Sequence, residues 1–318
     1  MLSQQARRSL AVALANPGAY RDISRVLELM DSTGPVYYVS SDTGSDSAGA
    51  GLHPDSPYAT LDYAVDQMTT AKNADNGTTI FVMPGHTETV AAAADIAVDV
   101  SGISIIGLGH GNARPTFTWS ATASTWTVTA ANCYIQNIRC TSSIDEMVKM
   151  FSVTAAHCTL DAVDVFQTSA ANIIQFLLTD ASAGDITVKN CSHYQVQEAG
   201  GSQAWIQLIG CDRARVVDNR FHLKLADVAT SAVISNITTA CLGVDIARNN
   251  ITMTGYSASL VSAILLLSTT TGNVADNRIG TNTAANTTIN VAAGCYSFNN
   301  LCTNVADTSG IVDPVVDI

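Results

Sequence analysis

Charged residues are scarce in this chain, at 13% of its 318 positions, whereas soluble domains usually carry about 25%. They are also unbalanced: 15 Lys and Arg face 27 Asp and Glu, which gives a formal net charge of −12. Proteins that bind nucleic acid present clusters of basic residues to the phosphates. The composition therefore argues against a nucleic-acid partner. At 47% hydrophobic residues it also excludes a disordered chain.

Three further features are missing. No apolar run approaches the roughly 20 residues that cross a bilayer, so we predict no membrane segment. The stretch Leu10–Ala15 after Arg7 and Arg8 is shorter than the apolar part of a secretory signal, and we expect no signal peptide. The eight cysteines form no Cys-x-x-Cys pair, which excludes a zinc site of that type and a dense disulfide scaffold. We expect reduced thiols and folding in a reducing compartment.

The first 35 residues differ from the rest of the chain. Ser3 is placed to cap one short helix, and Asp22 or Ser24 a second one, before the break at Thr33–Pro35. We predict a helical N-terminal arm over residues 1–35. Two interpretations stay open, namely a cap folded onto the main domain and an arm that docks on another protein. The candidate docking residues are Arg7, Arg8, Leu10, Leu14, Arg21, Arg25, Val26, Leu27 and Met30.

A degenerate repeat begins after the arm. Its unit is an apolar residue, two variable residues, a polar Asn, Gln or Asp, one variable residue and a second apolar residue, as in Cys133–Ile138 and Val216–Phe221. Successive units lie 22 to 30 residues apart, which is the length of one turn of a β-solenoid. The polar positions, expected to stack as a ladder, are Gln136, Asp161, Asn190, Asn219, Asn249, Asn277 and Asn299.

The repeat predicts an all-β fold in which short strands stack turn upon turn. Residues 36–305 would form the solenoid, and residues 306–318 a C-terminal tail. Alternating side chains along each strand would fill a narrow interior. Free cysteine behaves as a small buried hydrophobe, so we expect the thiols in or near that interior.

The segment from Tyr37 to His86 carries a resemblance to a known family. It contains Tyr37–Val39, Gly44–Asp46, Ser56–Leu61 and Thr79–His86. It resembles the opening of right-handed parallel β-helix proteins of the pectate-lyase-like superfamily, including their capping helix, here near residues 59–71. The first turn ends in Pro-Gly-His-Thr-Glu, as in many phage-like β-helix proteins. The resemblance implies a fold and leaves activity open, because this fold hosts lyases, hydrolases, epimerases, tailspikes and virion proteins.

Two kinds of enzyme on this fold would need different sets of residues. A calcium-dependent lyase needs clustered carboxylates and a basic residue, but no Asp-rich calcium loop is present. A glycoside hydrolase needs two carboxylates about 5–9 Å apart, and the pairs Asp161/Asp185 and Asp212/Asp218 are no better than chance among 27 acids. The other residues considered for the lyase site are Asp164, Arg213, Arg215 and Arg220.

Other candidate residues are weak. Trp119 and Trp126 mark either a sugar platform or the packing of two strands. The six histidines occur singly, without the spacing of a metal site or a catalytic triad. The segment Gly107–Gly111 lacks the Lys and the helix of a phosphate-binding loop. We therefore predict no catalytic residue, no metal and no cofactor.

The resemblance implies a structural bacteriophage virion protein, most concretely a capsid decoration or cement protein, and not an enzyme. It would bind the major capsid protein or another virion protein through the arm, form a homotrimer, and be assembled in the host cytoplasm. The alternative is a tailspike or depolymerase that acts as a polysaccharide lyase or glycoside hydrolase. A secreted adhesin or pectate lyase fits less well without an export signal. A carbohydrate stays open as a partner.

Overall fold

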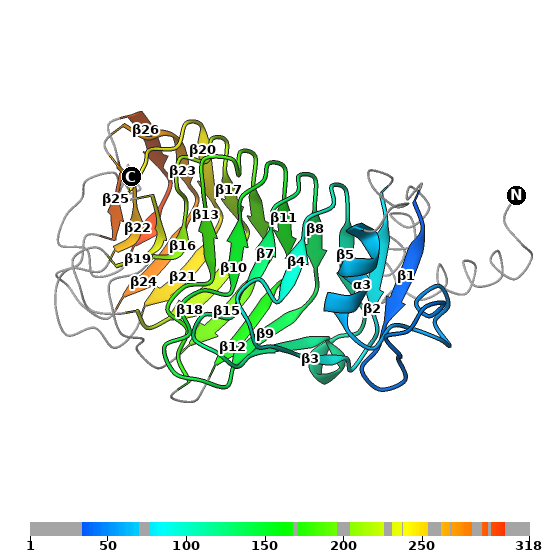
Figure 1. Cartoon of the computed structure of the whole chain (residues 1–318). Helices are drawn as coiled ribbons and strands as arrows, with labels where there is room; N and C mark the ends of the chain where they lie inside the picture. The colour runs from blue at the N-terminus through cyan, green and yellow to red at the C-terminus, as the bar shows by residue number, and fades with distance from the viewer. Residues whose placement is uncertain are drawn as a thin grey trace, which may run out of the picture.

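The computed structural model describes residues 34–69, 77–167, 171–195, 204–225, 231–236, 238–253, 262–267, 269–281, 288–291 and 294–302. Over these residues the chain winds into a parallel β-solenoid, and each full turn adds one strand to each of three sheets (Figure 1). The predicted all-β solenoid is thus confirmed. Residues 1–33, with the proposed docking residues, and residues 303–318 lie outside the described part.

The three sheets are named here in the order in which a turn visits them. Sheet 1 contains β1 (Val36–Val39), β2 (Thr79–Val82), β5 (Ser104–Gly107), β8 (Tyr134–Gln136), β11 (Thr159–Asp161), β14 (Thr187–Lys189), β17 (Arg215–Val217), β20 (Val244–Ala247), β23 (Thr271–Ala275) and β26 (Gly294–Phe298). Sheet 2 contains β3 (Thr87–Val90), β6 (Thr116–Trp119), β9 (Arg139–Ser142), β12 (Asp164–Gln167), β15 (Ser192–Gln195), β18 (Arg220–Leu223), β21 (Asn250–Met253), β24 (Arg278–Thr281) and β27 (Leu301–Cys302). Sheet 3 contains β4 (Ile96–Val98), β7 (Trp126–Val128), β10 (Phe151–Val153), β13 (Leu177–Thr179), β16 (Ala204–Gln207), β19 (Ala232–Ser235), β22 (Ser262–Leu265) and β25 (Ile289–Asn290).

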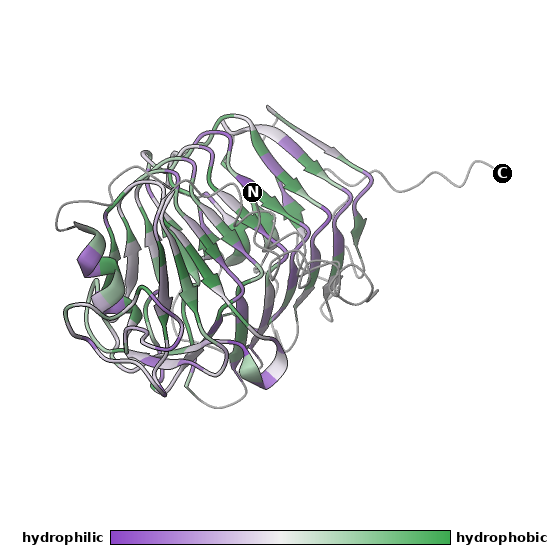
Figure 2. Cartoon of the chain, turned by 90° about the vertical axis from the view of Figure 1, so that its right-hand side faces the viewer, coloured by the Kyte–Doolittle hydropathy of each residue, from purple (hydrophilic) through white to green (hydrophobic). Residues whose placement is uncertain are grey.

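The strands pair in parallel and in constant register, so that equivalent residues of successive turns form columns. One interior column of sheet 1 shows why the stack holds: each member is a branched aliphatic residue that is almost fully buried, and burying one such side chain stabilises by about 1.5–3 kcal/mol. In Figure 2 hydrophobic and hydrophilic residues alternate along the strands. The column consists of Ile80, Ile105, Ile135, Leu160, Val188, Val216, Ile246 and Val274.

Aromatic rings fill the interior of the first turns. Trp119 and Trp126 are fully buried, and both pack on Phe151 at ring-centroid distances of 5.8 and 5.4 Å. The interpretation of these two tryptophans as a sugar platform is therefore wrong, because a buried ring cannot meet a ligand. The alternative is confirmed: the two tryptophans pack between strands in the interior.

Helix α3 (Leu61–Thr69) lies at the N-terminal end of the solenoid and packs on β4 and β1, within the stretch near 59–71 where a capping helix is expected (Figure 1). The Thr60 hydroxyl caps it by accepting the N–H of Tyr63, and the Glu88 carboxylate accepts the N–H groups of Leu61 and Asp62. The apolar face of α3 closes the first turn. That buried face consists of Leu61, Ala64, Val65 and Met68.

Candidate functional site

The seven residues of the predicted polar ladder lie at the tight corner between sheet 1 and sheet 2, but in three neighbouring columns. Gln136 and Asp161 share a column at the end of sheet 1. Asn190 and Asn299 lie in the turn itself, where every residue has a left-handed backbone. Asn219, Asn249 and Asn277 form the actual ladder, and the next member is Asn300, which the sequence analysis missed.

The ladder is a continuous chain of amides inside the corner. The Oδ1 atom of Asn249 accepts both the backbone N–H and the side-chain N–H of Asn219, at 3.1 and 3.0 Å. Asn277 does the same for Asn249, and Asn300 for Asn277. Each amide also donates to a backbone carbonyl, for example Asn249 to Val216 at 2.8 Å. Each buried polar group in the ladder thus finds its partners in the preceding and the following turn.

The turn column explains why the predicted positions split. Its residues all have φ between 53° and 60°, the left-handed conformation, at the point where the chain bends from sheet 1 into sheet 2. A sequence with two adjacent polar residues, such as Asn299 and Asn300, does not reveal which one turns and which one points inward. Besides Asn190 and Asn299, the column contains Asn137, Ala162, Asp218, Arg248 and Asp276.

Most charged residues that were candidates for chemistry pair with a residue of the adjacent turn. The Arg213 guanidinium donates to both oxygens of Asp185, at 2.7 and 2.6 Å, and lowers the pKa of that carboxyl. Arg248 binds Asp218 in the same way at 2.7 and 2.9 Å and lowers its pKa. Two further pairs are Arg139 with Asp164 and Arg215 with Asp245, at 2.9 and 3.3 Å.

Asp161 is buried and fully engaged. Its carboxylate accepts hydrogen bonds from the Tyr134 hydroxyl at 2.5 Å, Gln136 Nε2 at 3.1 Å and Asn190 Nδ2 at 2.8 Å, and lies 3.5 Å from Lys189 Nζ. A carboxylate held by four partners of this kind joins neighbouring turns and has a structural role.

The second proposed carboxylate pair has the same character. Asp218 is bound by Arg248, and Asp212 accepts the backbone N–H of Leu242 at 2.8 Å across the next turn. Both members are therefore engaged in contacts between successive turns. Within the described ranges no group of three or more His, Cys, Asp and Glu side chains is placed to hold a metal ion.

The cysteines follow the same interior columns as the aliphatic residues. All eight are free, and six of them are buried, as expected for small hydrophobes. Burial raises the pKa of Cys191 to about 12, so this thiol is a poor nucleophile. Cys211 and Cys241 occupy neighbouring turns with their sulfurs 3.9 Å apart.

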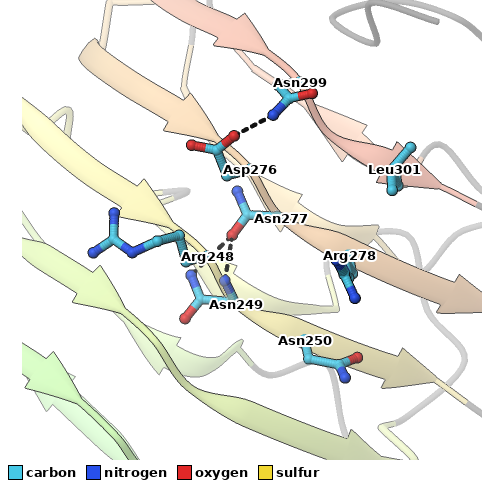
Figure 3. A pocket seen from close by; sticks show the side chains of 8 residues that line it. All are labelled: Arg248, Asn249, Asn250, Asp276, Asn277, Arg278, Asn299 and Leu301. Atoms are coloured by element: carbon cyan, nitrogen blue, oxygen red, sulfur yellow. Dashed lines mark hydrogen bonds between the residues drawn. The ribbon is translucent and has the colours of Figure 1, made fainter. Parts of the chain in front are cut away.

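A groove lies over the outer face of sheet 2 near the C-terminal end of the described solenoid. One cavity, of about 450 Å³, spans the corner, and a second, of about 440 Å³, continues it along sheet 2. Figure 3 shows Asn250, Arg278 and Leu301 on three neighbouring strands, with Arg248, Asp276 and Asn299 on the other side of the ladder. Asn250, Arg278 and Leu301 line both cavities.

Arg278 belongs to a polar column on this face. The register aligns Arg220, Asn250 and Arg278 on β18, β21 and β24, and all three are exposed. Within the described residues neither Arg220 nor Arg278 forms an ion pair. These two cations are therefore unlike Arg213, Arg215 and Arg248, whose charges are met within the solenoid.

An aromatic column runs beside the polar one. Phe166, Tyr194 and His222 lie on β12, β15 and β18 and stack face to face, with ring centroids 5.5 and 5.0 Å apart. The column stops at His222, because the next two turns carry Thr252 and Gly280 in its place. The second cavity lies over those two small residues. The sequence does not reveal these two columns, since their neighbouring residues are about 30 positions apart along the chain.

Among the residues proposed for a lyase site, Arg220 lies in register with Asn250, which lines the groove, but Arg220 itself lines neither cavity. Asp161, Asp164, Asp185, Arg213 and Arg215 are held in the contacts described above. Among the described residues no helix is long and apolar enough to span a membrane.

Comparisons with known proteins give similarities to solved structures only, since no family model and no curated protein matches the chain. A rhamnogalacturonan lyase is 14% identical over 87% of this chain and 86% of its own, with a TM-score of 0.43. The pectate lyase Pel9A is 14% identical over 87% and 82%, with a TM-score of 0.44. The GH136 lacto-N-biosidase from Eubacterium ramulus is 11% identical over 91% and 67%, with a TM-score of 0.44. The chain is thus similar to parallel β-solenoid polysaccharide lyases and a glycoside hydrolase at an identity that carries no inference about activity.

Proposed function

We propose that this chain is a non-catalytic structural protein of a bacteriophage virion, most concretely a capsid decoration or cement protein. The observation that carries the proposal is that most of the carboxylates and arginines that could form a lyase or hydrolase site are bonded to one another across successive turns. Asp185 with Arg213 and Asp218 with Arg248 are the clearest cases. Groups used in this way stabilise a rod and are not free to react.

The architecture suits a mechanical role. Each turn binds the next through backbone pairing in the three sheets, and the later turns are also joined by the amide ladder and by surface ion pairs. A solenoid of this kind is stiff along its axis, because each turn is held by both neighbours. The phage-like ending of the first turn, residues 84–88, supports the assignment to a virion.

The N-terminal arm is the proposed docking segment. Four of the fifteen basic residues of the chain, Arg7, Arg8, Arg21 and Arg25, lie within its first 35 residues, in a protein whose net charge is −12. Such an arm would give an arginine-containing, partly apolar contact for the major capsid protein or another virion protein, with three copies associating on the shell.

The location is tested on particles. Particles released from cells that carry the gene are purified on a density gradient and labelled with an antibody against residues 36–302. We expect label on the shell, and its loss when residues 1–33 are deleted while circular dichroism still reports a folded β-solenoid. Particles without the protein would contradict the virion assignment, and full binding by the truncated chain would contradict the docking arm.

The absence of catalysis is tested separately. The purified chain is incubated with a panel of acidic polysaccharides while absorbance at 235 nm and the release of reducing ends are followed. We expect neither signal to rise. Unsaturated products would instead establish the alternative, a tailspike or depolymerase that acts as a lyase, and reducing ends alone would establish a glycoside hydrolase.

A further inference from the structure

We propose that Cys211 and Cys241 form a redox site, in which a peroxide oxidises the two thiols to a disulfide that links adjacent turns of the solenoid. The pair lies at the corner between sheet 3 and sheet 1, on the loops that lead into β17 and β20, and its two sulfurs are 3.9 Å apart. This modification site goes beyond the structural role and does not depend on it, since either proposal can fail without the other.

The backbone places the two cysteines opposite each other. Cys211 lies four residues before Arg215 and Cys241 four residues before Asp245, and these two residues are paired in the register of sheet 1. Residues paired in this way have Cα atoms about 4.8 Å apart, and a disulfide spans Cα distances of about 4.4–6.8 Å. Rotation of the two side chains is therefore enough to join the sulfurs.

Hydrogen bonds hold the two loops in this register on both sides of the cysteines. Before them, the backbone N–H of Gly210 donates to the carbonyl of Thr239 at 3.3 Å. After them, the N–H of Arg213 donates to the carbonyl of Leu242 at 2.7 Å, and the N–H of Leu242 donates to the Asp212 carboxylate at 2.8 Å. A covalent bond between the turns thus needs no movement of the backbone, which is the usual source of strain in a disulfide.

Cys241 is the thiol that we expect to react first. The neighbouring thiol of Cys211 lowers the pKa of Cys241 to about 7, burial opposes this shift, and the Asn236 side chain adds to it. A thiol with this pKa is partly thiolate at neutral pH, and the thiolate is the form that reacts. Both sulfurs are buried, but the adjoining Leu242 is 53% exposed, so a small peroxide reaches them through a local opening of the loop.

The reaction needs one molecule of hydrogen peroxide. The Cys241 thiolate attacks one peroxide oxygen, the O–O bond breaks, and Cys241 becomes a sulfenic acid. The hydroxide that leaves takes up the proton that Cys241 had released. The Cys211 thiol then attacks the Cys241 sulfur, the S–S bond forms, and the proton of Cys211 leaves with the hydroxyl group as water. Two thiols are thus oxidised by two electrons, and one peroxide is reduced to two molecules of water.

Cys133 and Cys158 are a second pair on adjacent turns and offer a comparison. Cys133 lowers the pKa of Cys158, as Cys211 does for Cys241. Both sulfurs of this second pair, however, donate to the carbonyl of Ala130, at 3.2 and 3.5 Å, whereas the contact of Cys241 with the Thr239 carbonyl is 4.0 Å long. A hydrogen bond to a carbonyl stabilises the neutral thiol, so we expect the second pair to react more slowly.

The experiment follows the oxidation of the full chain. The reduced protein is treated with hydrogen peroxide at pH 7, free thiols are blocked under denaturing conditions, and the disulfide is located by tandem mass spectrometry. The stability of the oxidised protein is measured by urea denaturation with and without dithiothreitol. The test variants are Cys211→Ala and Cys241→Ala, and the control is Cys158→Ala, which removes the corresponding residue of the second pair. Circular dichroism verifies that each variant is folded.

We expect a link between Cys211 and Cys241 as the main product, with the other six thiols of the chain retained. Oxidation should lower the equilibrium constant of unfolding about 100-fold in the wild type and in Cys158→Ala, which is a typical effect of one disulfide. Dithiothreitol should reverse this gain. Cys211→Ala and Cys241→Ala should show no gain after the same treatment.

Three results would overturn the proposal. These are eight free thiols after the treatment, a main product without the link between Cys211 and Cys241, and a gain in stability that persists in Cys241→Ala. A linked protein whose unfolding constant is unchanged would also overturn it, because the bond would then not hold the two turns together.

Discussion

The corner between sheet 1 and sheet 2 is built in two ways within the same column. Toward the N-terminal end the buried position is apolar, and toward the C-terminal end it is an amide. Both halves bury the position almost completely, so burial alone does not select the residue type. The difference teaches that buried amides occur in this column as an unbroken run, because the side-chain oxygen of each one accepts hydrogen bonds from the amide of the preceding turn. The column consists of Ile138, Val163 and Cys191, followed by Asn219, Asn249, Asn277 and Asn300.

Breaking the run in its middle should have the largest effect. In Asn249→Ala the side-chain N–H of Asn219 and the carbonyl of Val216 lose a partner, and the backbone N–H of Asn219 loses its acceptor. Each buried polar group left unsatisfied costs about 1–3 kcal/mol. We expect the free energy of unfolding to fall by about 3 kcal/mol, measured by urea denaturation.

The matched control is the same substitution one column away. Asn299 is exposed in the turn, and its side chain bonds only Asp276 among the described residues. Asn299→Ala should change the free energy of unfolding by less than about 1 kcal/mol. Equal losses in Asn249→Ala and Asn299→Ala would show that the ladder contributes no more than a surface amide.

The apolar half offers the reverse experiment. Val163→Asn places an amide between Ile138 and Cys191, neither of which has a side-chain oxygen to accept its N–H. We expect a loss of about 2 kcal/mol in the free energy of unfolding, the cost of burying an unpaired amide. In Cys191→Asn the new amide instead adjoins Asn219, whose Oδ1 already accepts the N–H of residue 191 at 2.9 Å.

The contrast between these two variants tests whether an adjacent amide makes a buried asparagine acceptable in this column. Cys191→Asn extends the run by one turn, and we expect its cost in urea denaturation to stay below about 1 kcal/mol. If Cys191→Asn is as destabilising as Val163→Asn, the apolar half excludes amides for reasons of packing. An adjacent amide would then not be what makes a buried asparagine acceptable in this column.

The fold was within reach of the sequence because a solenoid repeats its own signal. The spacing of 22–30 residues and the polar position were visible without any structure, and so was the opening from Tyr37 to His86. The exact column to which each polar residue belongs could not be predicted from the sequence. A shift of one residue, as between Asn299 and Asn300, changes an exposed turn residue into a buried ladder amide, and composition does not distinguish the two.

The groove was out of reach for a different reason. Tyr194, His222, Thr252 and Gly280 become neighbours only when the register of β15, β18, β21 and β24 is known. Turn lengths vary along the chain, so the register cannot be obtained by adding a constant. The ion pairs between turns, such as Asp185 with Arg213, were hidden in the same way and looked like candidates for chemistry.

His193 is a buried polar side chain whose neighbours in the same column are apolar. It lies in the interior of sheet 2 between Val165 and Phe221, and its Nδ1 atom accepts the indole N–H of Trp205 at 2.7 Å. The Nε2 atom has no hydrogen-bond partner in the described structure. Burial lowers the pKa of His193 to about 3, so the imidazole stays neutral in the folded chain.

The sign of the pH effect follows from this pKa. Below pH 6.5 the unfolded chain binds a proton at residue 193 that the folded chain does not, so folding becomes less favourable as the pH falls. We expect His193 to remove about 2 kcal/mol of stability between pH 7 and pH 5. The raised pKa of Asp62, about 6 through burial and the neighbouring Asp66, acts in the opposite direction over part of this window.

The variant His193→Phe separates the two contributions. Its urea unfolding at pH 7 and pH 5 retains the effect of Asp62 and lacks that of His193. The wild type should therefore lose about 2 kcal/mol more than the variant over this interval. Parallel pH dependences of the two proteins would show that His193 takes up its proton in the folded state.

The smallest expected effect concerns the turn column, where Ala162 stands between Asn137 and Asn190. Its φ is 53°, a conformation that alanine adopts at a cost and that asparagine tolerates better. The side chain is not fully buried, so an added amide can reach solvent. We expect Ala162→Asn to raise the free energy of unfolding by about 0.5 kcal/mol, measured by urea denaturation. A loss of stability instead would mean that packing on Asp161 and Val163 determines which residue is accepted at position 162. Backbone conformation would then not select the residues of the turn column, whereas hydrogen bonds between neighbours select those of the ladder column.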